Sequence, residues 1–156
     1  MKLFKYILYK LTHPIFRFYW RIFKPKTSGA RAIILHEENV LLVKNINFKY
    51  WLLPGGMIDG KQTPEECLFR ELKEELDLSL NNFEYKLGEY FSEQEGKKDT
   101  IHIFIIKLDS PFFKKQWELE DAKWFPLNLL PENIGPATKR RIEEYKEGKK
   151  NIVSVW

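Results

Sequence analysis

Residues 55–78, GGMIDGKQTPEECLFRELKEELDL, constrain the fold of this 156-residue chain more than any other stretch, because they specify where a helix begins. Thr63 is a good N-cap, Pro64 lies at the first helical position, and Glu66 lies three residues after the cap. This combination is a capping box in which the missing N–H of proline costs no hydrogen bond. The sequence therefore predicts a helix that begins at Pro64.

The predicted helix has an apolar face and an acidic face side by side. At about 100° per residue, one arc carries four large apolar side chains: Leu68, Phe69, Leu72 and Leu76. A neighbouring arc of similar width carries three glutamates: Glu71, Glu74 and Glu75. Because side chains spaced i, i+3 and i+4 lie on one turn, we expect the three carboxylates to converge beside a buried stripe.

The three glutamates repel one another, at about a few tenths of a kcal/mol for each pair in water. Arg70 can neutralise one carboxylate, and a hard divalent cation can neutralise the others, since Mg²⁺ prefers carboxylate oxygens. A solvated acidic face without a ligand is the alternative, and the pattern ExxEE alone favours it. The preceding glycines Gly55 and Gly56 let the backbone approach a ligand closely, and they favour a metal site instead.

The stretch from Gly56 to Leu78 resembles the Nudix box, G-x5-E-x7-R-E-U-x-E-E-x-G-U, where U is a bulky aliphatic residue. The agreeing positions are Gly56, Arg70, Glu71, Leu72, Glu74, Glu75 and Leu78. Leu53-Pro54-Gly55 ahead of the box is also typical of that family. The resemblance extends from about residue 29 to residue 148.

Two positions depart from the Nudix pattern. Gln62 stands where the first glutamate of the box is expected, so it accepts a hydrogen bond but carries no charge. Asp77 stands where a glycine usually ends the helix. Aspartate tolerates the left-handed conformation better than most residues, so we expect a modest loss of stability at Asp77. Gln62 puts the number or the affinity of the metal ions in question.

The resemblance implies an α+β Nudix fold, a mixed β-sheet sandwiched between helices, with an N-terminal aromatic and basic helical extension. It implies a hydrolase that cleaves a phosphoanhydride bond in a nucleoside diphosphate linked to another moiety. Mg²⁺ or Mn²⁺ would bridge the enzyme and the phosphate oxygens while water attacks phosphorus. A catalytically weak Nudix-fold module, which binds a nucleotide or a membrane surface, is the alternative that Gln62 favours.

By motif position, the resemblance assigns five metal ligands: Gly55 through its carbonyl, Glu71, Glu74, Glu75 and Glu118. Glu71 would be a ligand or the general base, and Arg70 would orient the glutamates through charge-assisted hydrogen bonds. Glu118 lies six residues before Trp124, where a loop acid often supplies a further ligand in this family. A solvated loop glutamate is an equally good interpretation of Glu118.

Substrate contacts are expected close to the box and on the first two strands. Tyr50 and Trp51 precede the box loop and could stack on a base, although packing is the better interpretation of each aromatic singly. Arg31 and Lys44 could meet phosphates, although a solvated position is common for such residues. These four residues are the substrate-binding candidates.

Outside the box, the pattern predicts two hairpins, two short strands and a closing helix. The hairpins are Ala30–Leu35 with Val40–Lys44, and Phe83–Glu93 with Thr100–Leu108. The short strands are Trp51–Leu53 and Lys123–Phe125, the latter being the last strand, and the closing helix is Ala137–Glu147 with Gly148 after its end. Hairpins combined with two helices indicate an α+β domain.

The first 28 residues form a separate amphipathic basic and aromatic segment, and residues 29–156 form the Nudix hydrolase domain. Residues 24–29, KPKTSG, read as a linker between them. The segment 1–24 either lies at an anionic membrane surface or packs on the domain or on a second subunit. Its apolar runs are interrupted by charges, so we expect neither a membrane span nor a signal peptide.

The amino-acid composition indicates the class of protein, its compartment and its partners. Hydrophobic residues make up 44% and charged residues 31%, the profile of a globular protein. The single cysteine, Cys67, excludes an internal disulfide and fits a reducing compartment, so we expect a cytoplasmic protein, free or at the membrane surface. The net charge of +4 is mild, and no specific nucleic-acid partner is expected beyond a small nucleotide substrate.

Overall fold

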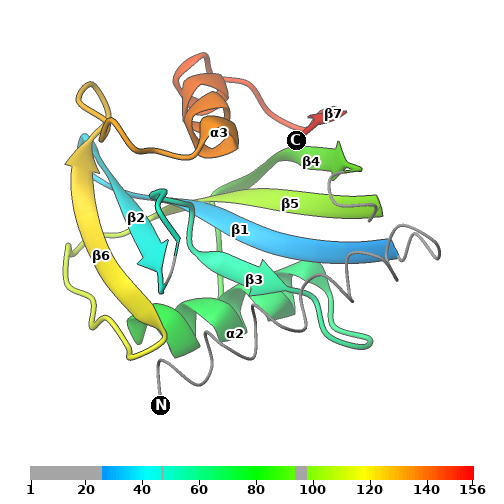
Figure 1. Cartoon of the computed structure of the whole chain (residues 1–156), viewed down its shortest axis with the longest axis horizontal. Helices are drawn as coiled ribbons and strands as arrows, with labels where there is room; N and C mark the ends of the chain where they lie inside the picture. Colours follow the sequence, from blue (N-terminus) through cyan, green and yellow to red (C-terminus); the bar gives the residue numbers. More distant parts are fainter. Residues whose placement is uncertain (1–25, 47, 94–97) are drawn as a thin grey trace.

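A mixed β-sheet forms the centre of the computed structural model, which describes residues 26–46, 48–93 and 98–156 (Figure 1). The strands are β1 (Lys26–His36), β2 (Asn39–Asn45), β3 (Gly55–Met57), β4 (Tyr85–Ser92), β5 (Lys98–Lys107), β6 (Leu119–Pro126) and β7 (Ile152–Val155). The helices are α2 (Pro64–Leu76) and α3 (Pro136–Lys146).

The strand order is β6-β2-β1-β5-β4-β7, with β3 paired to β1. β1 runs parallel to β5 and antiparallel to β2 and β3, so the sheet is mixed. α2 covers one face of the sheet and α3 covers the other, as Figure 1 shows. The expected mixed sheet between two helices is therefore confirmed.

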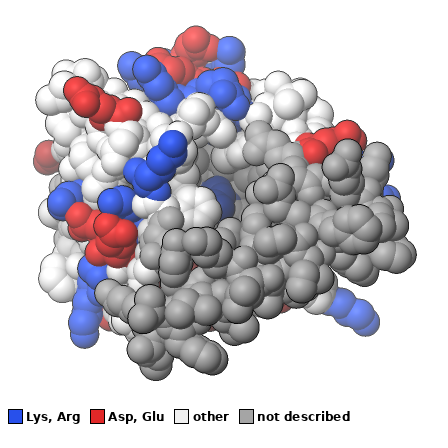
Figure 2. Space-filling view, in the orientation of Figure 1, with Lys and Arg blue, Asp and Glu red and all other residues white. Residues whose placement is uncertain are grey.

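Alternating residues of β1 supply both layers of the core. Ala30, Ala32 and Ile34 pack toward α2, against Leu68, Leu72 and Leu76. Ile33 and Leu35 pack toward α3, against Ile142. The outer surface of α3 carries charged side chains of both signs, which Figure 2 shows at the top of the view. The near-continuous apolar run of β1 is expected for a strand that is covered on both faces.

α2 begins at Pro64, as predicted, and the capping box is complete. The Thr63 side chain accepts a hydrogen bond from the Glu66 N–H at 3.2 Å, and the Glu66 carboxylate accepts one from the Thr63 N–H at 2.9 Å. Leu68, Leu72 and Leu76 are fully buried. Local signals thus fix the start of α2, and its apolar face fixes its docking on the sheet.

Both predicted hairpins, the β6 strand and α3 are confirmed, but three sequence-based assignments need correction. Residues 26–29 are not a linker, because they extend β1 and pair with β5 and β3. Trp51 and Leu52 form isolated bridges instead of a strand with Leu53. The closing element is β7, which pairs with β4, so Lys123–Phe125 lies in a strand, β6, that is not the last. Each error concerns pairing with a distant segment, which local pattern does not reveal.

The N-terminal segment 1–25 lies outside the described residues, so both of its interpretations, its boundary with the domain and its helical character stay predictions. Among the residues that the structure does describe, no helix combines the length and the hydropathy that a membrane crossing requires.

The end of α2 provides a stability test. Asp77 has a left-handed backbone with φ 57°, and its N–H donates to the carbonyl of Lys73 at 3.1 Å. Glycine adopts this conformation without steric cost, whereas alanine does not. We expect Asp77→Gly to raise the free energy of unfolding by up to about 1 kcal/mol and Asp77→Ala to lower it by a similar amount. Chemical denaturation measures both, and an alanine variant more stable than the glycine variant would contradict this account.

Candidate active site

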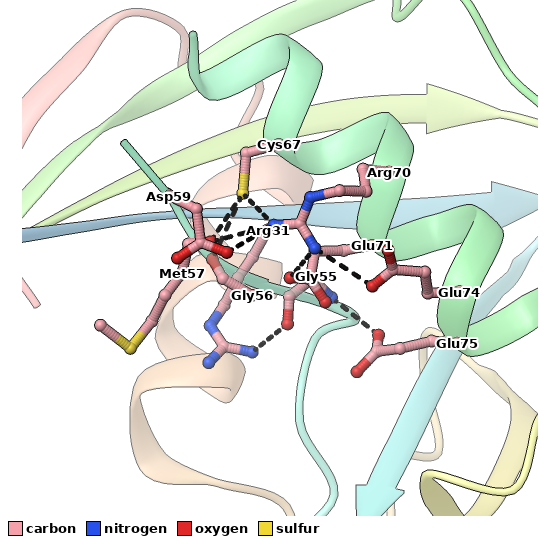
Figure 3. A network of polar contacts seen from close by, with 10 residues as sticks. All are labelled: Arg31, Gly55, Gly56, Met57, Asp59, Cys67, Arg70, Glu71, Glu74 and Glu75. Atoms are coloured by element: carbon pink, nitrogen blue, oxygen red, sulfur yellow. Dashed lines mark hydrogen bonds and ion pairs between the residues drawn. The ribbon is translucent and has the colours of Figure 1, made fainter. Parts of the chain in front are cut away.

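Glu71 and Glu75 of α2 lie beside the glycine pair that begins β3, and Glu74 lies next to them beside Arg70 (Figure 3). Glu75 is only 7% exposed, and its Oε2 accepts a hydrogen bond from the Gly55 N–H at 3.1 Å. Burial raises the pKa of Glu75 to about 7, although the Gly55 hydrogen bond and the charge of Arg31 oppose the shift. Glu75 is therefore a carboxylate that the fold holds in a poorly solvated position.

The carboxyl group of Glu71 occupies the space beside Gly56 that a Cβ atom would need. A Cβ atom built on Gly56 would lie 2.3 Å from the carboxyl group of Glu71, so any other residue would displace it. At Gly55, φ is +124° and a Cβ atom would lie 2.2 Å from the carbonyl oxygen of Ala30. Gly56 thus lets Glu71 of α2 approach the backbone of β3, whereas Gly55 lets β3 lie close to β1.

Burial raises the pKa of Glu71, the charge of Arg70 lowers it, and the charge of Glu74 raises it further. The Arg70 guanidinium lies 3.0 Å from Glu71 and 3.1 Å from Glu74, and it donates to the Met57 carbonyl at 3.3 Å. In Figure 3 the Glu74 carboxylate points to Arg70, whereas Glu75 points to Gly55. Arg70 therefore ties two of the glutamates to the end of β3.

Glu118 lies on a loop that is hydrogen-bonded to the end of α2. The N–H groups of Lys114 and Gln116 donate to the carbonyls of Leu76 and Glu75, each at 2.9 Å. Glu118 is exposed, and after burial and nearer groups its charge also raises the pKa of Glu71 and of Glu75. The structure thus brings Glu118 within electrostatic reach of the α2 glutamates.

The donor set fits a hard divalent cation. Two of its carboxylates carry raised pKa values because burial leaves their charge incompletely compensated, and oxygen ligands of this kind are those that Mg²⁺ prefers. Within the described residues, no three or more acidic, histidine or cysteine side chains are arranged so that they could hold a metal ion. Arg70 pairs with Glu74, and the Gly55 N–H donates to Glu75. A cation at this site would compete with Arg70 for the carboxylates.

Arg31 connects these glutamates to a cleft on the other face of the sheet. Its guanidinium donates to the carbonyls of Leu53 at 2.9 Å and Gly55 at 3.4 Å, and burial lowers its pKa despite the charges of Glu75 and Glu71. Arg31 also lines a cleft of roughly 280 Å³, here called the α3 cleft, together with Leu52, Leu53, Ser92, Asp99, Ile101, Thr138 and Trp156.

The other substrate candidates do not line the α3 cleft. Trp51 is 8% exposed and packs edge-on against Phe125 at 4.9 Å, as the packing interpretation expects. Lys44 pairs with Glu120 at 2.8 Å, and its contact with phosphate stays a prediction. The Lys49 ammonium group lies 4.6 Å from the centroid of the Tyr50 ring, and Tyr50 is half-buried.

Sequence reasoning missed Ile101, Thr138 and Trp156 in the cleft. They lie on β5, on α3 and directly after β7, so no single motif contains them. The run IVSVW at residues 152–156 carries the only usable signal, since its β-branched residues favour a strand that ends in an aromatic residue.

A family model described as the NUDIX domain matches residues 25–145. A Bacillus subtilis (strain 168) protein named "Putative 8-oxo-dGTP diphosphatase" is 30% identical over 128 residues, which cover 81% of this chain and 84% of that protein. An "ADP-ribose pyrophosphatase" of Methanocaldococcus jannaschii is 28% identical over 117 residues, covering 72% of this chain and 69% of that protein.

Solved structures give the same result. The crystal structure of a MutT NUDIX hydrolase from Burkholderia pseudomallei superposes with a TM-score of 0.66 at 25% identity, covering 76% of this chain and 97% of the other. The family model begins at residue 25, one residue before β1, and so includes all but the first residue of the segment that the sequence pattern had assigned to a linker.

The pKa of Glu75 predicts how stability depends on pH. Its folded-state pKa of about 7 lies above the ordinary value of 4.5, so folding favours the protonated form. The free energy of unfolding of metal-free protein should therefore fall as pH rises between these values, by about 3 kcal/mol. We expect denaturant titrations in EDTA at pH 5 and pH 8 to show this fall in the wild type and a smaller one in Glu75→Gln. An equal fall in both proteins would contradict the assignment.

Proposed function

Because the chain belongs to the Nudix hydrolase family and is a hydrolase of phosphorus-containing anhydrides, we propose that it cleaves a phosphoanhydride bond in a nucleoside diphosphate linked to another moiety, with Mg²⁺ or Mn²⁺. The observation that carries this proposal is the docking of Glu71 and Glu75 against the backbone of Gly55 and Gly56. Two poorly solvated carboxylates lower the stability of the metal-free protein, and a bound divalent cation would offset that loss.

The residues that would hold the cation are Glu71, Glu74, Glu75, Glu118 and the carbonyl of Gly55. When bound, a divalent cation supplies neutralisation of phosphate charge and lowers the pKa of the attacking water. Three of these groups come from α2, the carbonyl comes from the first residue of β3, and Glu118 comes from the loop that is hydrogen-bonded to the end of α2.

Glu71 is our candidate for either a ligand or the general base. Burial raises its pKa, which makes proton acceptance more favourable than for a solvated glutamate, and a base is most effective with a pKa near the working pH. Arg70 would orient Glu71 and Glu74 through the ion pairs that it makes with both. Neutralising Arg70 should thus disorder both carboxylates without removing either.

Arg31 is the candidate that would bind substrate phosphate. It adjoins Glu75 electrostatically and lines the α3 cleft, so a phosphate chain at the glutamates would reach it before the rest of the substrate enters the cleft. A guanidinium presents several donors in a fixed plane, which suits phosphate oxygens. The two relatives are named for 8-oxo-dGTP and for ADP-ribose, and we carry over only the nucleotide that those names share.

A second candidate function is a nucleotide-binding module with weak catalysis. Gln62 favours it, because its Oε1 atom is buried and makes no hydrogen bond in the described part of the chain, and it replaces a charged residue of the box. Fewer acidic groups near the site would lower the affinity for the cation.

Turnover tests the leading proposal. Purified protein is assayed with Mg²⁺ or Mn²⁺ against nucleoside triphosphates, ADP-ribose, dinucleoside polyphosphates and sugar nucleotides, beside the double variant Glu74→Gln, Glu75→Gln. We expect the double variant to lose about 10²-fold or more in kcat, since two ligand charges disappear. Glu38→Gln, an exposed position in the β1–β2 turn, is the matched control and should retain activity. No turnover by the wild type, or equal turnover by the double variant, would defeat the proposal.

Gln62→Glu separates the two candidate functions. If the wild type is an enzyme, restoring the box glutamate should change kcat by less than about tenfold and lower the Mg²⁺ concentration needed for half-maximal activity. An inactive wild type together with an active Gln62→Glu variant would favour the binding module. Both proteins are measured in the same assay across a range of Mg²⁺ concentrations.

A further inference from the structure

The α3 cleft combines an aliphatic and aromatic wall with polar side chains, which suits a flat ring with polar edges. Its walls include Leu52, Leu53, Ile101 and the indole of Trp156, beside the polar side chains of Ser92, Asp99 and Thr138, and Arg31 lies at the end nearer Gly55. Pockets that hold entire drug-sized ligands measure about 300–1,000 Å³, so roughly 280 Å³ suits one part of a nucleotide. An apolar, aromatic wall favours a base over a phosphate group.

Trp156 is held in this wall through the peptide that joins it to Val155. The Val155 carbonyl accepts a hydrogen bond from Arg141 at 3.2 Å, and the Trp156 N–H donates to the Phe91 carbonyl at 2.9 Å. Both polar groups of one peptide unit are thus fixed, one from α3 and one from β4. The indole also meets the ring of Tyr90 edge-on, with centroids 6.0 Å apart.

Arg141 is a buried cation whose surroundings leave it little freedom. It is 3% exposed, and its guanidinium lies 3.9 Å from the centroid of Tyr90 and 5.7 Å from that of Trp156. Glu144 pairs with Arg141 at 3.0 Å and accepts a hydrogen bond from the Tyr90 hydroxyl at 2.8 Å. A buried ion pair is not by itself stabilising, so this network is better explained by what it positions.

Gly88 lets β7 approach closely enough for this arrangement. A Cβ atom at residue 88 would lie 2.5 Å from the carbonyl oxygen of Ile152, so a larger residue would push β7 away from β4. β7 pairs with β4 from Gly88 to Phe91, and Trp156, the residue directly after β7, lines the cleft. On the opposite face of β7, Val153 and Val155 are each 73% exposed.

We propose that the base of the nucleotide substrate enters the α3 cleft and stacks on Trp156, and that Arg141 is a positioning residue that holds Trp156 in place. This inference rests on the proposed function, because it assumes a nucleotide whose phosphates lie at the α2 glutamates. Arg31 connects the two sites, since it contacts the Gly55 carbonyl and lines the cleft. Trp156 then contributes to the choice of substrate, while α2 carries the chemistry.

The test compares binding of a probe with a base and a probe without one. Calorimetry with ADP, GDP and pyrophosphate, in the presence of Mg²⁺, is applied to the full chain and to Trp156→Ala, Trp156→Phe and Arg141→Lys. We expect Trp156→Ala to weaken binding of ADP or GDP about ten- to hundredfold, the range for losing one base–aromatic stack, and to leave pyrophosphate unchanged. Trp156→Phe should retain most of the affinity, and Val153→Ala is the control on the exposed face of the same strand.

Arg141→Lys should weaken the nucleotides but not pyrophosphate, and a shifted tryptophan emission spectrum should accompany the loss. A melting curve for each variant identifies any that fail to fold, and a folded Trp156→Leu, which keeps an apolar side chain but removes the aromatic ring, then decides in place of Trp156→Ala. Nucleotide and pyrophosphate weakened equally, nucleotide affinity unchanged in Trp156→Ala, or no nucleotide binding by the wild type would each overturn the proposal. Trp156-dependent binding without turnover would defeat hydrolysis alone, and turnover independent of Trp156 would defeat this inference alone.

Discussion

The contact between the carboxylates of α2 and the backbone of Gly55 and Gly56 is the constraint on which the site depends. Glu75 accepts a hydrogen bond from the Gly55 N–H, and Glu71 occupies the space that a Cβ atom on Gly56 would fill. This contact requires α2 to lie flat on the sheet, which Leu68, Leu72 and Leu76 ensure by their burial. The same packing that stabilises the domain therefore forces acidic groups into a poorly solvated position.

Two arginines offset part of the negative charge of the α2 glutamates. Arg70 neutralises the exposed side of the cluster through Glu71 and Glu74, whereas Arg31 approaches from the opposite face of the sheet and holds the carbonyls of Leu53 and Gly55. Burial still raises the pKa of Glu71 and of Glu75. The net result is an oxygen-rich site with incomplete compensation, the condition under which a divalent cation gains most.

Local signals made α2 predictable, and long-range pairing made the rest difficult. The capping box at Thr63, the start at Pro64 and the shared face of the glutamates follow from residues within one turn, and the Nudix box then supplied the family. The extension of β1 to Lys26 and the existence of β7 depend on partners more than 50 residues away. Trp156, Thr138 and Ile101 meet only because those strands pair, so spacing along the chain could not bring the α3 cleft together.

The central claim is that the α2 glutamates bind a divalent cation, and titration of Mn²⁺ followed by electron paramagnetic resonance tests it most directly. The account predicts that the free Mn²⁺ signal is depleted by the wild-type protein and that Mg²⁺ restores it by competition. Glu71→Gln and Glu75→Gln should each weaken this binding. Undiminished Mn²⁺ signal in the presence of folded wild-type protein, with and without ADP, would contradict the account.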